Sequence, residues 1–431
     1  MISRRACICI LIALFCPPAG LIASLICIYD DFECWKIYIA IIALAMGIFA
    51  YYYEPTIECD LTRYYAVVKR MIGHTYDESL KIAKESLLFG EDPLYSFILL
   101  CWGVAGTGDV HFLPMISTAC VYYIGMYITF RYSQDEVEEK GCAVQYLYFI
   151  LLAVNFFAIV NNVRNMLAFA LIGLAIFRDC YLKKRNLITL LIYLSGLYMH
   201  LSGVVLIILR FVVPFSKKLK LPILIAGLLV PTVITTLSSM LRGVNPSNPV
   251  LNRLVNLINS GSIYYTHADA GWAVTVANSG AQQSFKILYI TFAIAVVVLY
   301  FLFCRYLNET TDEKTLEIGK KSYSIDFTFL CSVYAIACAP MVMPEYWRFG
   351  CTAILCGGGL YAQTPVFMCK NDRLVRCGYF VFAFGMFALW FRNLTLYSDV
   401  VIGVTRSFVS GPLVSLILFG FDTSILSLIS I

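Results

Sequence analysis

The sequence predicts an all-α, polytopic integral membrane protein that folds as a single membrane domain over residues 1–431, and two observations support this prediction. Of the 431 residues, 60% are hydrophobic and only 14% are charged, whereas about a quarter of the residues in a soluble domain are charged. Apolar runs also recur along the whole chain at roughly 20 residues, the length that one helix needs to cross the hydrocarbon layer. Because lipid offers no partner to the polar groups of an open strand, the spanning segments must be helices.

We expect about 12–14 membrane-embedded helices, each bounded to within a few residues. The apolar segments that predict them are 6–29, 35–53, 93–107, 111–131, 142–161, 164–182, 187–200, 202–215, 221–241, 284–307, 323–343, 346–369, 374–392 and 405–428. The first segment follows two arginines and so imitates a signal peptide, but Pro17 and Pro18 interrupt it and the apolar run then resumes. We therefore expect a retained membrane helix that the prolines break, rather than a cleaved leader.

Clusters of basic residues predict which side of the membrane each loop occupies. Lysines and arginines gather in the short stretches 178–185 and 217–220, and such clusters mark the cytoplasmic side. The apolar residues between them must cross the membrane twice, so the tip of this hairpin, near His200, lies on the outer side. The same alternation places three more polar stretches on the outer side: 161–165, 242–283 and 344–348.

The polar stretch 54–92 contains an amphipathic segment, 64–89, whose apolar residues recur at helical spacing, so we expect a helix lying along the membrane interface. The side on which it lies depends on the segment 93–107. If that segment spans the membrane, 54–92 is cytoplasmic. We favour a re-entrant segment, because 93–107 is short and rich in glycine at its end; 54–92 and the N-terminus are then both outside.

Polar residues at the ends of apolar helices are costly to place and mark candidate functional positions. Asp60, Arg63 and Tyr64 lie at i, i+3 and i+4 and share one helix face, with Tyr65 beside them. Asp60 is a candidate catalytic carboxylate, and Arg63, Tyr64 and Tyr65 are candidate substrate-binding residues. Alternatively, an acidic residue at this position could simply cap the amphipathic helix.

Arg164 opens a long apolar helix among asparagines that include Asn165, with no acidic neighbour in sequence. The arginine could extend to lipid phosphate, but a planar guanidinium also matches the oxygens of a pyrophosphate or sugar in a bidentate way. His200 and Ser202 lie at the predicted hairpin tip. A histidine there could be a hydrogen-bonded core residue or, with its ordinary pKa near 6.5, a general base.

Glu345 and Arg348, at i and i+3, are either a structural ion pair or a second acid–base group on the outer side. The loop 242–283 is rich in Asn, Ser, Gly and aromatic residues. Such a composition is typical of surfaces that bind sugar rings, and of ordered extracellular loops in general; Trp272 is its candidate substrate-binding residue.

Several other classes of function lack their motifs. The chain contains no P-loop, zinc-protease, nucleophile-elbow or dinucleotide motif, and its net charge of +5 is spread too thinly to indicate nucleic-acid binding. The one Cys-x-Cys pair, Cys7 and Cys9, has no partner cluster that would indicate zinc. No Asp-x-Asp motif is present either, so we expect no essential metal and no cofactor.

In the order of its motifs the chain resembles the EpsG-like family of membrane polysaccharide polymerases, which is related to Wzy-type O-antigen polymerases. The matching residues are Tyr53-x-Pro55, Asp60-Leu61-x-Arg63-Tyr64-Tyr65, Asn162-Val163-Arg164-Asn165, Lys183-Lys184-Arg185 and His200-x-Ser202. The resemblance covers about residues 35–215 well and the remainder by helix pattern. Family members often carry Arg-Gln where this chain has Arg164-Asn165.

The resemblance implies polymerisation of undecaprenyl-pyrophosphate-linked oligosaccharide repeat units into exopolysaccharide, capsule or O-antigen. The reaction would be an inverting glycosyl transfer at the outer face of a bacterial inner membrane, which needs a base for the acceptor hydroxyl and cations for the leaving group. His200 or Glu345 would be the base, and Arg63, Arg164 and Arg348 would hold pyrophosphate or sugar. A flippase and a chain-length regulator of the same pathway are the candidate protein partners.

Two alternative functions stay open at this stage. The first is a lipid-linked oligosaccharide flippase, which would need charges along a central cavity, whereas the charges of this sequence are predicted to collect on one side. The second is an O-antigen ligase, which uses similar donors and a different acceptor.

Overall fold

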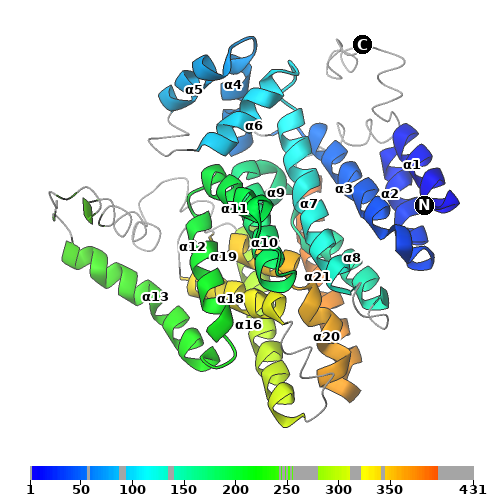
Figure 1. The fold of residues 1–431 in the computed structure, drawn as a ribbon, viewed down its shortest axis with the longest axis vertical. Coiled ribbons are helices and arrows are strands. Elements are labelled where there is room, and N and C mark those ends of the chain that lie inside the picture. The colour runs from blue at the N-terminus through cyan, green and yellow to red at the C-terminus, as the bar shows by residue number, and fades with distance from the viewer. Residues whose placement is uncertain are drawn as a thin grey trace.

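The computed structural model describes residues 2–55, 59–86, 94–133, 140–241, 280–310, 322–340 and 345–396, with a few single positions between 244 and 255. These described residues form helices and contain no strand (Figure 1). Five described stretches are long and apolar enough to cross a membrane: Phe32–Tyr51, Phe112–Ser133, Lys220–Leu241, Gln282–Glu309 and Gly358–Arg392. The predicted fold class is confirmed, and the chain is an all-α, multi-pass membrane protein. The predicted helix 405–428 and most of the predicted loop 242–283, including Trp272, lie outside the described residues.

The first two helices, α1 (Arg4–Phe15) and α2 (Pro17–Asp30), form an antiparallel hairpin. Cys16 has an extended backbone (φ −145°, ψ 90°), and Pro17 then opens α2 at a position where a missing N–H costs little. Arg5 pairs with Asp30 at 2.9 Å, and the Ser3 hydroxyl donates to Asp31. The predicted break at the prolines is therefore confirmed, but the two halves do not continue in one direction, because the chain reverses at Cys16 and the two helices pair.

Helix α3 (Trp35–Tyr51) packs antiparallel against α7 (Phe112–Ser133). Trp35 stacks on Phe130 at one end, with ring centres 5.6 Å apart, and Tyr51 lies against Phe112 at the other, 5.3 Å away. We call the end at which α3 finishes and α7 begins the site end. The opposite end, which carries the basic stretches 178–185 and 217–220, is called the basic end.

The basic end is identified by contacts of the lysine- and arginine-rich stretches. The ring centres of Tyr181 and Tyr132, near the last residue of α7, are 5.1 Å apart. The Nζ atom of Lys183 lies 3.9 Å from the ring centre of Tyr323. The N-terminal hairpin opens at this same end, because Asp30 and Asp31, which pair with Arg5 and Ser3, are joined to the start of α3 by the single helical turn Phe32–Cys34. The prediction that the N-terminus lies on the same side as 54–92 is therefore wrong, and the reversal at Cys16 is the reason.

Three short helices, α4 (Asp60–Met71), α5 (Tyr76–Glu85) and α6 (Tyr95–Ala105), gather at the site end, at the top of Figure 1. The 11 residues of α6 rise only about 17 Å, too little to cross about 30 Å of hydrocarbon. Trp102 of α6 donates to the carbonyl of His74 at 3.1 Å, which ties α6 to the α4–α5 connection. The chain thus leaves α3 and enters α7 at the same end, as the re-entrant interpretation of 93–107 requires.

The middle of the chain continues through α8 (Lys140–Ala153), α9 (Phe156–Asn161) and α10 (Val163–Ile176), which leads into a π-helical turn, Phe177–Tyr181. Helices α11 (Leu187–Met199) and α12 (Gly203–Val212) then form the predicted hairpin, with its tip at the site end. A Cβ on Gly196 of α11 would collide with Ile172 of α10, so this glycine permits the close approach of the two helices. Helix α13 (Lys220–Leu241) has no buried residue and presents its apolar surface outward.

The last described helices are α16 (Gly280–Glu309), α18 (Tyr323–Ala337), α19 (Glu345–Cys356), α20 (Gly358–Met368) and α21 (Asp372–Leu396). The predicted segment 346–369 is thus two helices, which meet at Gly357. Phe349 of α19 packs on Phe169 of α10, with ring centres 5.2 Å apart, and on Tyr334 of α18, at 4.4 Å. These contacts place the second turn of α19 beside the second turn of α10, so the starts of both helices lie toward the site end.

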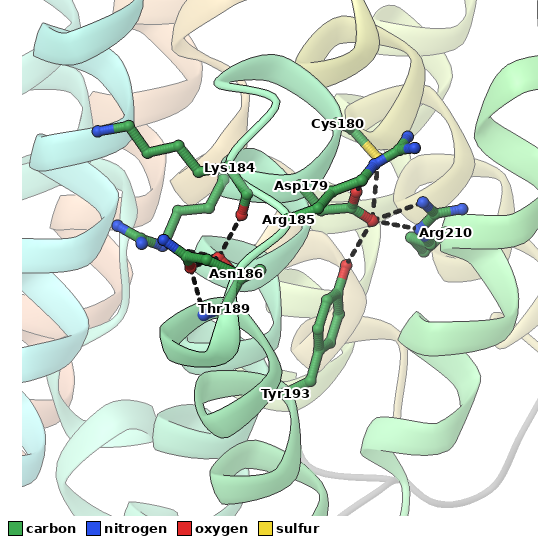
Figure 2. Close-up of polar contacts among 9 residues, drawn as sticks. Asp179, Cys180, Lys184, Arg185, Asn186, Thr189, Tyr193 and Arg210 are labelled. Atoms are coloured by element: carbon green, nitrogen blue, oxygen red, sulfur yellow. Dashed lines mark hydrogen bonds and ion pairs between the residues drawn. The ribbon is translucent and has the colours of Figure 1, made fainter.

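A buried carboxylate at the basic end holds the α11–α12 hairpin in place. Asp179, in the π-helical turn, is 5% exposed, and Figure 2 shows side chains from three directions meeting on it. It accepts hydrogen bonds from Arg185 at 2.8 Å, from Arg210 of α12 at 2.6 Å and from Tyr193 of α11 at 3.5 Å. One buried acid therefore joins α10, α11 and α12, and fixes the base of the hairpin whose tip carries His200.

We predict that Asp179→Asn destabilises the protein by about 3 kcal/mol, because removing one partner of a buried pair leaves the other charge uncompensated. Arg210 is the partner most affected, since its side chain is only 19% exposed. Thermal unfolding of the protein in detergent measures the effect. Arg185→Gln is the control: the Arg185 side chain is 68% exposed, so its loss should cost less than about 1 kcal/mol. Equal losses from both variants would contradict this account.

Candidate functional site

Side chains from four parts of the fold converge at the site end. We call this group the arginine cluster, and its members are Tyr64 on α4, Arg164 on α10, His200 and Ser202 in the turn between α11 and α12, and Glu345 and Arg348 on α19. The guanidinium of Arg164 lies 6.0 Å from the centre of the Tyr64 ring. Burial raises the pKa of Tyr64 to about 12, although the charges of Arg164 and Arg348 both oppose this. Sequence positions separated by almost 300 residues therefore share one electrostatic environment.

The break between α9 and α10 places Arg164 in this cluster. Asn162, at the break, has φ −113° and ψ 45°, and its side chain donates to the carbonyl of Ala158 at 3.0 Å. Asn161 donates to the hydroxyl of Tyr53 at 2.9 Å. The asparagines that flank Arg164 thus anchor the first turn of α10 to α9 and to the end of α3. Asn165 is buried and points about 100° away from Arg164; its side-chain oxygen has no hydrogen-bond partner among the described residues.

His200 lies outside both helices of the hairpin, with an extended backbone at the end of α11. The backbone N–H of Ser202 donates to its Nδ1 at 3.0 Å, and the Ser202 hydroxyl lies 2.6 Å from the same nitrogen. An amide N–H can only donate, so Nδ1 is the acceptor and the proton of the neutral ring is on Nε2. Burial lowers the pKa of His200 far below 6.5, and the charges of Arg164 and Arg348 lower it further. The ring is therefore neutral and presents an N–H.

Glu345 and Arg348 are paired at the start of α19, with Arg348 Nη1 2.6 Å from Glu345 Oε1 and 2.7 Å from Oε2. Their side chains are only 13% and 18% exposed. The pair lies beside the other members of the cluster, because the charge of Arg348 acts on both His200 and Tyr64. Arg348 Nε is buried and has no hydrogen-bond partner among the described residues, so this guanidinium retains donor capacity for a ligand.

The remaining predicted residues lie around the cluster. Asp60 and Arg63, on the first turn of α4, form a loose pair at 3.5 Å and are 43% and 58% exposed, so they lie at the solvent side of the cluster. The Asp60 charge still reaches the Tyr64 hydroxyl, whose pKa it raises. Tyr65 is not in the arginine cluster. Its ring faces His111, with ring centres 5.3 Å apart, because consecutive helix positions point about 100° apart.

The sequence analysis missed a second group of side chains, which we call the His111 cluster: Tyr51, Glu54, Tyr65, Asp109 and His111. Nδ1 of His111 lies 2.7 Å from Asp109 and Nε2 lies 3.4 Å from Glu54. The Tyr51 hydroxyl donates to the other oxygen of Asp109. The one available signal was Asp109-x-His111 after a glycine-rich turn. The other members come from the end of α3 and from α4, far earlier in the chain, so sequence spacing could not reveal the group.

The two histidines have opposite protonation states. Burial lowers the pKa of His111, but its hydrogen bonds to Asp109 and Glu54 outweigh burial and raise the pKa to about 9. Burial likewise raises the pKa of Asp109, but its bonds to His111 and Tyr51 bring it down to about 2. The His111 cluster therefore holds two carboxylates against one imidazolium and is net negative. The arginine cluster holds two guanidinium groups against one carboxylate and is net positive.

The described residues contain no group of three His, Cys, Asp or Glu side chains arranged to hold a metal ion. The absence of an essential metal stays a prediction. Comparison with known proteins gives one match: the EpsG family model covers residues 35–401, which is most of the chain. Neither the curated proteins nor the solved structures give a match.

We predict that His111 makes the stability of the protein depend on pH. The ring has a pKa of about 9 when folded and an ordinary value of 6.5, so its contribution is complete below pH 6.5 and is lost as the pH rises through 9. The difference in unfolding temperature between the wild type and His111→Gln should therefore decrease as the pH rises from 6.5 to 9. A difference that does not change across this range would show that His111 is not held as an imidazolium.

Proposed function

Because this chain belongs to the EpsG family, we propose that it is a membrane glycosyltransferase that joins oligosaccharide repeat units carried on a polyprenyl pyrophosphate. The observation that carries this proposal is the convergence of Arg164 and Arg348 at the site end, where the charges of both act on His200 and on Tyr64. A cluster of two guanidinium groups and one carboxylate has a net positive charge, which favours a ligand with more than one negative charge. A pyrophosphate that links a sugar to a lipid carrier has this charge, and its lipid would lie in the adjacent membrane.

The proposed step is an inverting substitution at the anomeric carbon of the donor sugar. The acceptor hydroxyl oxygen forms a bond to this carbon, the bond from the carbon to the pyrophosphate oxygen breaks, and the polyprenyl pyrophosphate leaves with the bonding electrons. Negative charge accumulates on the leaving oxygen as the bond breaks. Donors that are already oriented toward this oxygen stabilise the transition state more than the ground state, and Arg164 and Arg348 are suited to that role.

The geometry favours different roles for the two candidate bases. His200 accepts a hydrogen bond at Nδ1 and carries its proton on Nε2, so it is suited to donate to a pyrophosphate or sugar oxygen. The acceptor proton then requires a carboxylate. Glu345 is the better placed one, since it is only 13% exposed and lies beside Arg348, whereas Asp60 lies at the solvent side. On this proposal Glu345 takes the proton, and Ser202 fixes the orientation of His200.

The flippase alternative predicts charged side chains along a central path through the membrane. Among the described residues, buried charges occur at both ends of the bundle: the arginine cluster at one, and Asp179 with Arg210 at the other. Asp326, which accepts from Tyr300 at 2.6 Å and lies 3.8 Å from Lys217, also belongs to the basic end. The prediction that charges collect on one side is therefore wrong. These groups at the basic end are ion-paired, however, and they hold helices together.

We predict that Arg164→Lys and Arg164→Ala both keep expression and folding but lose activity, on the order of a hundredfold. Lysine keeps the positive charge but lacks the planar fork that binds two phosphate oxygens together. The measurement is polymer ladder length and yield, normalised to the amount of protein extracted from the membrane.

The outcomes separate three roles of Arg164. Full activity of Arg164→Lys would exclude a bidentate contact and indicate an arginine that only extends to lipid phosphate. Disappearance of both variants from the membrane would mean that Arg164 holds the fold. Arg63→Lys is the matched control: it makes the same exchange at the exposed edge of the site, so it should have a much smaller effect.

A further inference from the structure

The His111 cluster lies next to the arginine cluster and carries the opposite net charge. Helix α4 contributes consecutive residues to the two groups, Tyr64 to the arginine cluster and Tyr65 to the His111 cluster. Asn161, three residues before Arg164, donates to Tyr53, and the Tyr53 hydroxyl is close enough to Tyr65 to affect its pKa. Polar groups therefore continue from one cluster to the other.

One member of the His111 cluster has unused hydrogen-bonding capacity. Tyr65 is only 7% exposed, and its hydroxyl has no hydrogen-bond partner among the described residues. Burial raises the pKa of this hydroxyl, and four oxygen-bearing side chains lie close enough to raise it further: Glu54, Asp109, Tyr53 and Tyr51. A buried hydroxyl without a partner costs about 1–3 kcal/mol, so a position that keeps one is suited to a ligand that supplies the missing bond.

The carboxylates of the cluster are also incompletely used. Each is bonded to His111, but the Glu54 side chain is 50% exposed and that of Asp109 is 32% exposed, so both can accept from a ligand. The charge of the group is net negative, which opposes the approach of a pyrophosphate. Aromatic rings surround the same position, because Tyr51 packs on both His111 and Phe112, at 5.5 Å and 5.3 Å.

We infer that the His111 cluster is a carbohydrate-binding subsite that holds an uncharged sugar ring of the acceptor beside the pyrophosphate site. Sugar hydroxyls donate to carboxylates, and the apolar face of a sugar ring packs on aromatic side chains, so the residue types match this ligand. The inference rests on the proposed function and deepens it: the positive cluster takes the donor's pyrophosphate, and the negative, aromatic cluster takes the sugar that is to be extended. The opposite net charges of the two clusters favour the pyrophosphate in the arginine cluster and the uncharged sugar in the His111 cluster.

The test uses two probes on the purified full-length protein in detergent. The first probe is the repeat oligosaccharide, released by mild acid from the lipid carrier of the cells of origin, and the second is inorganic pyrophosphate. Saturation-transfer NMR measures binding of the first and calorimetry measures binding of the second. The variants are Tyr65→Phe and Glu54→Gln in the His111 cluster and Arg164→Ala in the arginine cluster. Tyr76→Phe is the matched control, since Tyr76 packs on Trp102 away from both clusters.

We expect Tyr65→Phe and Glu54→Gln each to weaken oligosaccharide binding by about tenfold, the effect of losing one good hydrogen bond, and to leave pyrophosphate binding unchanged. Tyr76→Phe should bind both probes as the wild type does. Tyr65→Phe should also unfold at the same temperature as the wild type or higher, because it removes a buried hydroxyl that has no partner. A purely structural role for Tyr65 would instead lower the unfolding temperature and leave binding intact.

The results that overturn the inference differ from those that overturn the proposed function. The carbohydrate subsite is excluded if the wild type shows no saturable oligosaccharide binding, or if neither variant of the His111 cluster weakens it. The proposed function is contradicted if Arg164→Ala binds pyrophosphate as tightly as the wild type. Because each probe reports on its own cluster, the two failures can be told apart.

Discussion

The cost of placing charge inside an apolar helix bundle is the constraint on which the rest of this structure depends. A charge held away from water must be paired, and each pairing fixes the elements that supply its partners. Asp179 joins three helices at the basic end because two arginines and a tyrosine meet on it. At the site end the arginine cluster has fewer carboxylates than guanidinium groups. The buried carboxylate at the basic end is therefore paired with arginines, whereas in the arginine cluster Glu345 pairs with Arg348 and Arg164 adds a second positive charge.

Histidine shows how the same side chain takes opposite roles in two neighbouring environments. His200 faces two arginines and accepts from a backbone N–H, so it is neutral and its free nitrogen is a donor. His111 lies between two carboxylates and is charged. The protonation state follows from the neighbours and not from the residue type. A polymerase that must hold an anionic leaving group and a neutral sugar close together needs such a difference over a short distance.

The sequence was sufficient to predict the helical membrane fold, and the basic loops predicted that Arg164, His200 and Arg348 lie at one end of it. That prediction succeeds because helix length and loop charge are local properties. The N-terminal hairpin was missed because a proline pair predicts a break but not its direction, which depends on contacts such as Arg5 with Asp30. The His111 cluster was missed because its members come from three separate segments. For the same reason, sequence alone could not show that Tyr64 and Tyr65 belong to different clusters.

The central claim is that this protein makes glycosidic bonds at the expense of a lipid pyrophosphate linkage. The most direct measurement reconstitutes the purified protein in liposomes whose only substrate is the polyprenyl-pyrophosphate-linked repeat unit, and follows the products over time. The account predicts a ladder of polymers and the release of one polyprenyl pyrophosphate for each bond formed. Transfer of the intact lipid-linked unit from one leaflet to the other, without any polymer, would contradict the account and identify a transporter.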